Sequence, residues 1–208
     1  MTNRSGFFLT LEGIEGSGKS TLAGLLAEHF ASAGMEVVVT AEPGGCAVGE
    51  AIRQLVLHST EPISDNAELL LFEAARAQHV QCTILPALQR GAIVICDRFT
   101  DSSLAYQGYA RGIDINIIKT LNDFATGGLT PDLTILLDLP AEVGLARQVK
   151  MDRVSSERLA FHEAVREGYL AIAKAEPERV VVISAEMGVE DVLREAIIVL
   201  EHARSKEK

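Results

Sequence analysis

The chain has 208 residues, a length that suits one sizeable α/β domain and is too short for two. Hydrophobic residues make up 48% of it and charged residues 23%, as is typical of soluble globular proteins. The formal net charge of −10 leaves no general basic surface, so we expect no nucleic-acid partner and no binding to anionic membranes.

Cysteine usage and the N-terminus bear on location. Cys46, Cys82 and Cys96 are far apart and form no CxxC pair, which indicates reduced thiols of a cytosolic protein. The first residues lack the basic region and apolar core of a signal peptide. No apolar run approaches the roughly 20 residues of a membrane span. The sequence therefore predicts a cytoplasmic protein without a membrane anchor.

Apolar runs and helical periodicity alternate along the chain. Short apolar runs predict strands at 7–11, 35–40, 92–96, 133–139 and 180–183. Apolar residues at helical spacing predict helices around 22–30, 48–56, 67–89, 115–124, 155–172 and 189–200. Pro86 should bend the third of these, and Ser155–Glu157 should open the fifth. Because the strands show no polar alternation, we expect an α/β protein with a five-stranded parallel sheet and helices on both faces.

The segment between the first strand and the first helix carries the clearest motif. Gly13–Ser20 fits the phosphate-loop pattern G-x-x-x-x-G-K-[ST] with no mismatch. Its backbone N–H groups and the helix N-terminus should bind ATP phosphates, with Lys19 on the outer phosphates and Ser20 on Mg²⁺. A plain glycine turn is the alternative, but it leaves Lys19 and Ser20 unexplained. The expected nucleotide contacts are Gly13, Glu15, Gly16, Ser17, Gly18, Lys19, Ser20 and Thr21.

A parallel sheet gathers ligands at the carboxyl ends of its strands. This rule places the phosphate loop, Glu42, Asp97 and Arg98, and the loop after Leu139 on one rim. Asp97 resembles the acidic residue that holds Mg²⁺ in phosphate-loop enzymes, and Arg98 can grip a second phosphate group bidentately. A structural ion pair at a strand end is the alternative for these two residues.

Five sets of residues together resemble one family. They are Leu11–Thr21, Glu42–Gly45, Asp97–Phe99 with Ser102–Gly108, Pro131–Thr134, and Phe161–Glu163 with Tyr169. This set resembles the bacterial thymidylate kinases. The resemblance implies a three-layer P-loop kinase fold in a single domain over 1–208. It also implies Mg²⁺-dependent transfer of the ATP γ-phosphoryl group to dTMP, giving dTDP and ADP for dTTP biosynthesis, by a homodimer.

The resemblance assigns several residues to the nucleoside of dTMP. Phe72 should stack on the thymine ring, and Arg76, one helical turn later, should hydrogen-bond the base. Ser102 and Gln107 should contact the base edge. Tyr106 should pack near the sugar C2′ and disfavour a 2′-hydroxyl. Ordinary core packing is the alternative for the two aromatic residues.

Four further residues are assigned to the rest of the acceptor. Arg53 and Arg98 should hold its phosphate, and Glu15 should accept a hydrogen bond from its 3′-hydroxyl. Glu42 should lie near the acceptor and the metal. For Arg53 the alternative is a solvated helix face, and for Glu42 it is an exposed side chain in a Pro-Gly turn.

Bacterial members supply catalytic arginines from a lid after the fourth strand, and this segment departs from their pattern. The lid around 147–153 is several residues shorter than we expect, so either it is truly short or residues are missing from the chain. Arg147, Lys150 and Arg153 remain as candidates for stabilising transition-state charge, beside Lys19 and Arg98. The adenine contacts are also undefined, because Ser184–Glu186 replaces an Asp-containing turn.

Other functions remain open at this point. The nearest is another phosphate-loop kinase, acting on a deoxynucleoside or a different monophosphate. A nucleotide switch or ATP-driven binding protein predicts slow hydrolysis without an acceptor, although the chain has no Asn-Lys-x-Asp guanine motif. A domain that binds nucleotide without turnover is the last alternative.

Overall fold

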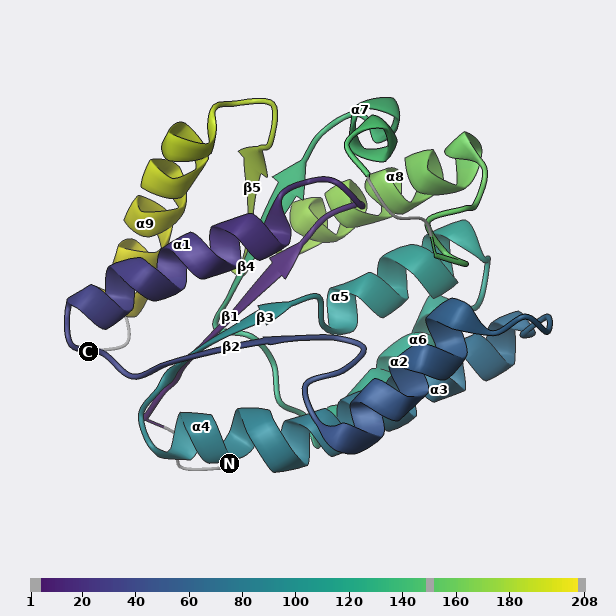
Figure 1. Cartoon of the computed structure of the whole chain (residues 1–208), viewed down its shortest axis with the longest axis horizontal. Helices are drawn as coiled ribbons and strands as arrows, with labels where there is room; N and C mark the ends of the chain where they lie inside the picture. The colour runs from purple at the N-terminus through teal and green to yellow at the C-terminus, as the bar shows by residue number, and fades with distance from the viewer. Residues whose placement is uncertain (1–4, 149–151, 206–208) are drawn as a thin grey trace.

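Five parallel strands form the centre of the fold in the computed structural model, which describes residues 5–148 and 152–205 (Figure 1). Their order across the sheet is β2-β3-β1-β4-β5, so β1 lies in the middle and pairs in parallel with β3 and β4. The predicted five-stranded parallel sheet is confirmed. The strands are β1 (Phe7–Glu12), β2 (Val37–Ala41), β3 (Ile93–Asp97), β4 (Leu133–Asp138) and β5 (Val180–Ser184).

Helices cover both faces of this sheet. α1 and α9 pack on each other over one face, and α4 and α8 contact strands from the other (Figure 1). α2, α3 and α6 pack together beside β2 and β3. The described helical segments, in which η marks a π-helix, are α1 (Lys19–Ser32), α2 (Ala47–His58), α3 (Asp65–His79), η1 (Val80–Ile84), α4 (Leu85–Gln89), α5 (Thr100–Ser103), η2 (Leu104–Ala110), α6 (Ile115–Thr126), α7 (Ala141–Ala146), α8 (Leu159–Ala175) and α9 (Val189–Ser205).

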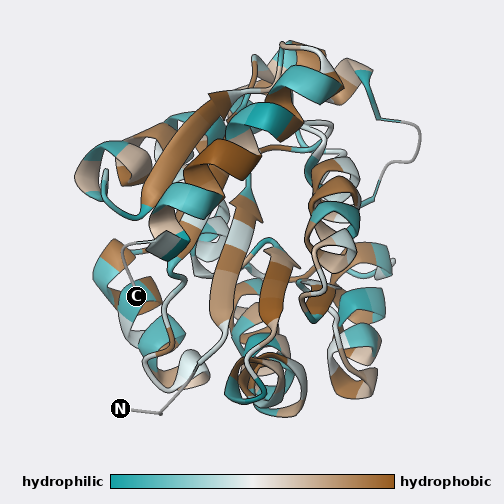
Figure 2. Cartoon of the chain, turned by 90° about the vertical axis from the view of Figure 1, so that its left-hand side faces the viewer, coloured by the Kyte–Doolittle hydropathy of each residue, from teal (hydrophilic) through white to brown (hydrophobic). Residues whose placement is uncertain are grey.

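Burial explains why the three inner strands, β1, β3 and β4, lack polar alternation. All six residues of β1 are buried, and so are all but the last residue of β3 and of β4. Figure 2 shows these strands as largely apolar ribbons between helices of mixed polarity. Within the described residues, no helix combines the length and apolar character needed to cross a membrane.

Two helix predictions need correction. The expected helix at 67–89 is divided into α3, η1 and α4, because a π-turn precedes Pro86, whose missing N–H and bulky ring disturb regular α-helix bonding. The expected helix at 155–172 begins later, at Leu159. Ser155 and Ser156 bond instead to Asp152, which closes a turn before the helix. The sequence analysis also predicted no helix at α5, η2 or α7.

Candidate active site

The phosphate loop connects β1 to α1 and depends on glycine geometry. Gly13, Gly16 and Gly18 have positive φ values of 139°, 71° and 92°, which L side chains rarely adopt. A Cβ on Gly16 would collide with the carbonyl of Gly144 in α7. The segment after β4 therefore packs directly on the loop, and the structure places both on the same rim.

Lys19 lies inside the loop. Its Nζ donates to the carbonyls of Gly13 and Ile14 at 2.9 and 2.8 Å, and to Ser17 Oγ at 3.3 Å. Burial, reinforced by the nearby charge of Arg98, lowers the pKa of Lys19 to about 8. The loop thus holds a cation at the position where the motif requires one.

Ser20 and Asp97 join the loop to the end of β3. The Ser20 hydroxyl donates to Asp97 Oδ2 at 2.7 Å, and Ser20 is exposed. Oxygen donors of this kind are the ligands that Mg²⁺ takes in proteins. The pair is therefore a chemical match for a magnesium site beside the phosphate loop.

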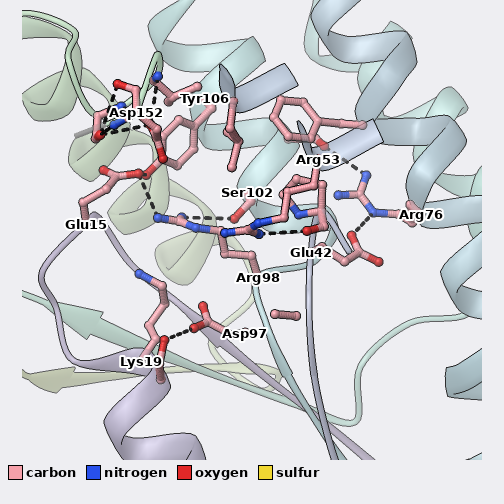
Figure 3. Close-up of a pocket in the computed structure, with 18 of the residues that line it drawn as sticks. Glu15, Lys19, Glu42, Arg53, Arg76, Asp97, Arg98, Ser102, Tyr106 and Asp152 are labelled. Atoms are coloured by element: carbon pink, nitrogen blue, oxygen red, sulfur yellow. Dashed lines mark hydrogen bonds and ion pairs between the residues drawn. The ribbon is translucent and has the colours of Figure 1, made fainter. Parts of the chain in front are cut away.

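Arg98 directly follows Asp97 and turns its side chain across the loop (Figure 3). Among the described residues, Arg98 is the only non-glycine residue with a positive φ, 71°. This strained backbone geometry turns the side chain away from the direction of the strand. Its guanidinium donates to Gly13 O at 3.0 Å, to Glu15 Oε1 at 2.9 Å and to Tyr169 Oη at 3.1 Å. Arg98 is thus a rigidly held cation at the mouth of the loop.

Glu15 is the carboxylate inside the loop. Burial alone would raise its pKa, but Arg98, His162 and the Tyr106 hydroxyl together hold that pKa well below its ordinary value. Tyr106 donates to Glu15 Oε1 at 2.6 Å. The His162 ring lies 3.2 Å from Oε2 without the alignment of a hydrogen bond. Glu15 is therefore an anion fixed between Arg98 and Tyr106.

Glu12, at the end of β1, organises the floor beneath Arg98. It is fully buried and accepts hydrogen bonds from Phe99 N, Ser102 Oγ and Tyr169 Oη at 2.7, 2.6 and 2.9 Å. Burial, together with the charge of Asp101, raises the pKa of Glu12 to about 7. Ser102 is thereby held against the pocket by a residue that the sequence analysis did not select.

Arg76 of α3 is a buried hub. Its Nε donates to Glu42 and one terminal nitrogen donates to Glu73, at 2.8 and 2.6 Å. That same nitrogen also bonds Ser103 and Asn122, while the other terminal nitrogen donates to Phe99 O at 3.0 Å. These contacts account for all but one of its five N–H groups among the described residues, so a single donor remains for the pocket.

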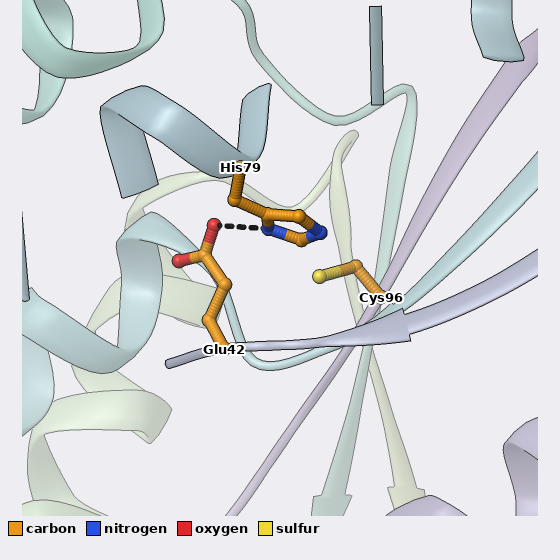
Figure 4. Close-up of side chains that lie close together, drawn as sticks. All are labelled: Glu42, His79 and Cys96. Atoms are coloured by element: carbon orange, nitrogen blue, oxygen red, sulfur yellow. Dashed lines mark hydrogen bonds and ion pairs between the residues drawn. The ribbon is translucent and has the colours of Figure 1, made fainter. Parts of the chain in front are cut away.

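Glu42 also belongs to a cluster with His79 and Cys96 whose ligand atoms lie within 4.8 Å of one another (Figure 4). The cluster is fully engaged in other bonds. His79 spans Glu42 Oε1 and Thr40 Oγ1 at 3.0 and 2.7 Å. Burial raises the pKa of the Cys96 thiol well above its ordinary value, which favours the S–H that donates to Arg98 O. With Arg76 also on Glu42, the geometry favours a hydrogen-bonded support over a cation site.

A cavity of about 390 Å³ opens between the phosphate loop and helices α2 and α3 (Figure 3). Every residue assigned above to dTMP lines it: Glu15, Glu42, Arg53, Phe72, Arg76, Arg98, Ser102, Tyr106 and Gln107. Gly16, Lys19, Ser20 and Asp97 line the same cavity. The structure thus brings part of the loop, both candidate metal ligands and the predicted acceptor residues to one cavity. Gly13, Ser17, Gly18 and Thr21, also predicted as nucleotide contacts, are not among the residues that line it.

Part of the cavity wall was missed. Leu57, Ser103, Gln148, Asp152, Val154 and Ser155 also line it. An Asp-x-x-Ser turn at the end of the short lid was the available pattern. Asp152 Oδ1 accepts from Val154 N and Ser155 N at 3.0 and 2.8 Å. Such turns are common in loops, so the pattern alone does not point to a pocket.

The two lid arginines lie outside the cavity lining. Arg147 donates to the carbonyl of Ala185 at 3.1 Å, in the segment where the adenine contacts were sought. Arg153 pairs with Glu68 and donates to Val56 O. Their catalytic role stays a prediction, and this arrangement does not bring either guanidinium to the loop. Lys150 lies outside the described residues.

Comparison with known proteins was made on this basis. A family model described as thymidylate kinase matches residues 11–196. The chain belongs to the thymidylate kinase family. A thymidylate kinase of Synechococcus sp. strain JA-2-3B'a(2-13) is 55% identical over 179 residues, which cover 86% of each chain. A thymidylate kinase of Citrifermentans bemidjiense is 49% identical over 97% of this chain and 92% of its own.

Solved structures agree with this family. The crystal structure of thymidylate kinase from Ehrlichia chaffeensis superposes with a TM-score of 0.80 at 36% identity, and covers 94% of this chain and 99% of that one. The predicted family and P-loop kinase fold are therefore confirmed. The chain is therefore a phosphotransferase of nucleotide biosynthesis that uses ATP as the phosphate donor and dTMP as the acceptor, and the predicted activity is confirmed.

Proposed function

We propose that the cavity binds dTMP as the acceptor and that the phosphate loop presents ATP to it. One phosphate oxygen of dTMP then forms a bond to the γ-phosphorus of ATP as the bond between that phosphorus and the β,γ-bridging oxygen breaks. The products are dTDP and ADP. The observation that carries this proposal is the single cavity shared by the loop and all the assigned acceptor residues.

The base end of the acceptor site lies at α3. Phe72 is half-buried and lines the cavity, so one ring face can stack on thymine while the remainder packs on the core. The remaining N–H of Arg76 suits a base carbonyl oxygen. Gln107 is buried and also lines the cavity, where its amide can complete the reading of the base edge.

The phosphate end lies between α2 and the loop. Arg53 donates to Pro43 O at 2.8 Å, which holds its side chain over the cavity, and Arg98 faces it from β3. Two guanidinium groups can neutralise the acceptor phosphate and align it for in-line transfer. Phosphoryl transfer depends on such positioning and charge more than on covalent catalysis.

Ser20 and Asp97 would hold Mg²⁺, and the ion would neutralise charge on the ATP phosphates. Lys19 would leave its contacts with the loop carbonyls and donate to the outer phosphates. Among the cations that line the cavity, Lys19 and Arg98 are bonded to the phosphate loop itself, so these two can stabilise transition-state charge. Both roles follow from the positions of these side chains around the loop.

Binding of dTMP in the absence of ATP tests the acceptor site. We expect calorimetry to show dTMP binding that weakens by about tenfold in Phe72→Ala, because base stacking contributes roughly 1–3 kcal/mol. Ile198→Ala, an exposed apolar residue on α9, is the matched control and should bind normally. Failure of the unaltered protein to bind dTMP would refute the proposal.

We also propose a homodimer. Phe124 and Ile117 on α6 and Leu70 on α3 are exposed by 86%, 53% and 55%, and the two helices pack on each other. A second copy of the chain would cover this apolar surface. Light scattering should give twice the mass of one chain, and Phe124→Asp should give one chain mass.

The three free thiols fit a reducing compartment, and we propose a cytoplasmic location.

A further inference from the structure

Glu68 is a carboxylate in the first turn of α3 with a side chain only 1% exposed. Burial would raise its pKa, but hydrogen bonds from Arg153 and Gln107 and the charge of Arg111 outweigh burial, and its pKa is lowered. Glu68 is therefore an anion at neutral pH, in a place where an unpaired charge would be costly.

One oxygen of Glu68 contacts Gln107, at the base end of the cavity. Gln107 Nε2 donates to Glu68 Oε1 at 2.8 Å. Since an ionised carboxylate only accepts hydrogen bonds, this contact fixes the Gln107 amide with its nitrogen toward Glu68. The Gln107 carbonyl oxygen is left as the acceptor available to a ligand.

That orientation matters for base choice. Thymine carries a donor N3–H beside an acceptor O4, whereas cytosine carries an acceptor N3 beside a donor amino group. Gln107 and Arg76 line the same cavity, so the free amide oxygen of Gln107 and the one remaining N–H of Arg76 together match thymine and oppose cytosine. A reversed amide would remove this discrimination.

The other oxygen of Glu68 contacts the turn at 152–155, which forms a different part of the cavity wall. Glu68 Oε2 pairs with Arg153, which also donates from Nε to Val56 O at 2.8 Å and from its backbone to Leu57 O at 3.1 Å. Arg153 belongs to the turn at 152–155, which lines the cavity. The Glu68–Arg153 pair thus fastens that turn to α2 and α3.

We propose that Glu68 is a positioning residue that fixes two walls of the acceptor pocket at once, the amide of Gln107 and the turn at 152–155. The inference rests on the proposed function, since it concerns dTMP in that pocket. Glu68 itself is outside the cavity lining, so it acts on the acceptor through Gln107 and Arg153. It also gives Arg153 a positioning role.

Glu68→Gln is the direct test. The neutral amide can present its own nitrogen to Gln107, which lets the Gln107 amide reverse. Its oxygen keeps only a neutral hydrogen bond to Arg153, so the ion pair that holds Arg153 is lost. We expect the ratio of kcat/KM for dTMP over dCMP to fall at least about tenfold, the size of one lost hydrogen-bond preference. The KM for dTMP should rise while the KM for ATP stays nearly constant.

Glu157→Gln is the matched control. Glu157 accepts the same type of bond from Arg111, at 2.6 Å, but forms no side-chain hydrogen bond or ion pair with Gln107 or Arg153 among the described residues. The variant Glu157→Gln removes one negative charge beside Arg111, which also pairs with Glu68. It should leave the dTMP:dCMP ratio of kcat/KM unchanged. If the dTMP:dCMP ratio of kcat/KM falls equally in Glu68→Gln and Glu157→Gln, the effect comes from the loss of one negative charge near Arg111. That result would overturn the proposal.

Two further variants separate the walls and serve if Glu68→Gln fails to fold. Arg153→Gln should raise the KM for dTMP without lowering the dTMP:dCMP ratio of kcat/KM. Gln107→Met should lower that ratio. The proposal fails if Arg153→Gln leaves the KM for dTMP unchanged. It also fails if Gln107→Met leaves the dTMP:dCMP ratio of kcat/KM unchanged. Failure of the unaltered protein to phosphorylate dTMP would instead refute the proposed function.

Discussion

Ser20 and Asp97 are 77 residues apart in the chain, and the hydroxyl of the first donates to the carboxylate of the second at 2.7 Å. The contact exists because β1 and β3 are adjacent parallel strands, with Leu11 in register with Asp97. The helix that follows the phosphate loop therefore starts beside the end of β3. Two oxygen-bearing side chains from distant segments therefore meet beside the phosphate loop.

Asp97→Asn should raise the Mg²⁺ concentration needed for half-maximal rate by about 10- to 100-fold, the usual cost of losing a group that supports a metal ligand. The amide keeps the shape of Asp97 but removes its negative charge. Kinase assays over a Mg²⁺ titration measure this. Asp138→Asn, at the end of β4 and paired with Arg166, should leave the Mg²⁺ requirement unchanged. An equal shift in both variants would contradict the metal assignment.

Arg98→Lys should raise the KM for dTMP more than tenfold and the KM for ATP by less than about threefold. Lysine keeps the charge but loses the planar fork that binds a phosphate through two parallel bonds. Steady-state kinetics with each substrate varied in turn gives both constants. Arg90→Lys, an exposed partner of Glu36, is the control. Parallel changes in the two KM values would rule out a specific acceptor role.

Tyr106 should exclude a ribose 2′-hydroxyl by the bulk of its ring. Tyr106→Phe is then expected to keep the preference for dTMP over ribothymidine monophosphate, and Tyr106→Ser to reduce it at least about tenfold. The ring packs on Phe161 and Tyr169, with centroids 6.1 and 6.2 Å away, so thermal unfolding must confirm that the serine variant is folded. Tyr109→Ser, half-exposed on the same π-helix, is the control. Unchanged selectivity in a folded Tyr106→Ser protein would exclude the steric role.

Glu12 predicts a pH dependence of stability. Its pKa is about 7 in the folded protein, above its ordinary value of 4.5, so the folded state binds the proton more tightly than the unfolded state. The contribution of Glu12 to the free energy of unfolding therefore falls as pH rises from about 4.5 to 7 and stays low above pH 7. Over that window the loss amounts to about 3 kcal/mol.

Glu12→Gln removes this contribution. Urea unfolding at several pH values should show the variant gaining stability relative to the unaltered protein as pH rises through that window. Glu36→Gln, on an exposed carboxylate, provides the comparison and should follow the unaltered protein. If Glu12→Gln also follows it at every pH, Glu12 does not titrate as described.

The strand ends were predictable from sequence because a parallel sheet brings them to one edge. That rule alone predicts Asp97, Arg98 and Glu42 beside the phosphate loop. The supports were not predictable. Arg76 bonds Ser103 and Asn122, 27 and 46 residues away, and such pairs depend on how α3, α5 and α6 pack.

The same limit applies to Glu68 and Arg153, which are 85 residues apart. No local pattern distinguishes either from a surface charge, and a helical charged residue is usually solvated. The contact between Arg147 and Ala185 was not predictable either. The segment after β5 lacks the expected Asp-containing turn, and the carbonyl of Ala185 there accepts a hydrogen bond from Arg147.

The most direct measurement is ADP formation from ATP and Mg²⁺ with dTMP, dUMP, dCMP, dGMP or no acceptor. We predict strong turnover with dTMP, weaker turnover with dUMP and little with the others. This result would establish the reaction and the base preference together, and would show that the cations of this chain suffice for transfer. ADP release that does not depend on an acceptor, or faster turnover with another monophosphate, would contradict the central claim.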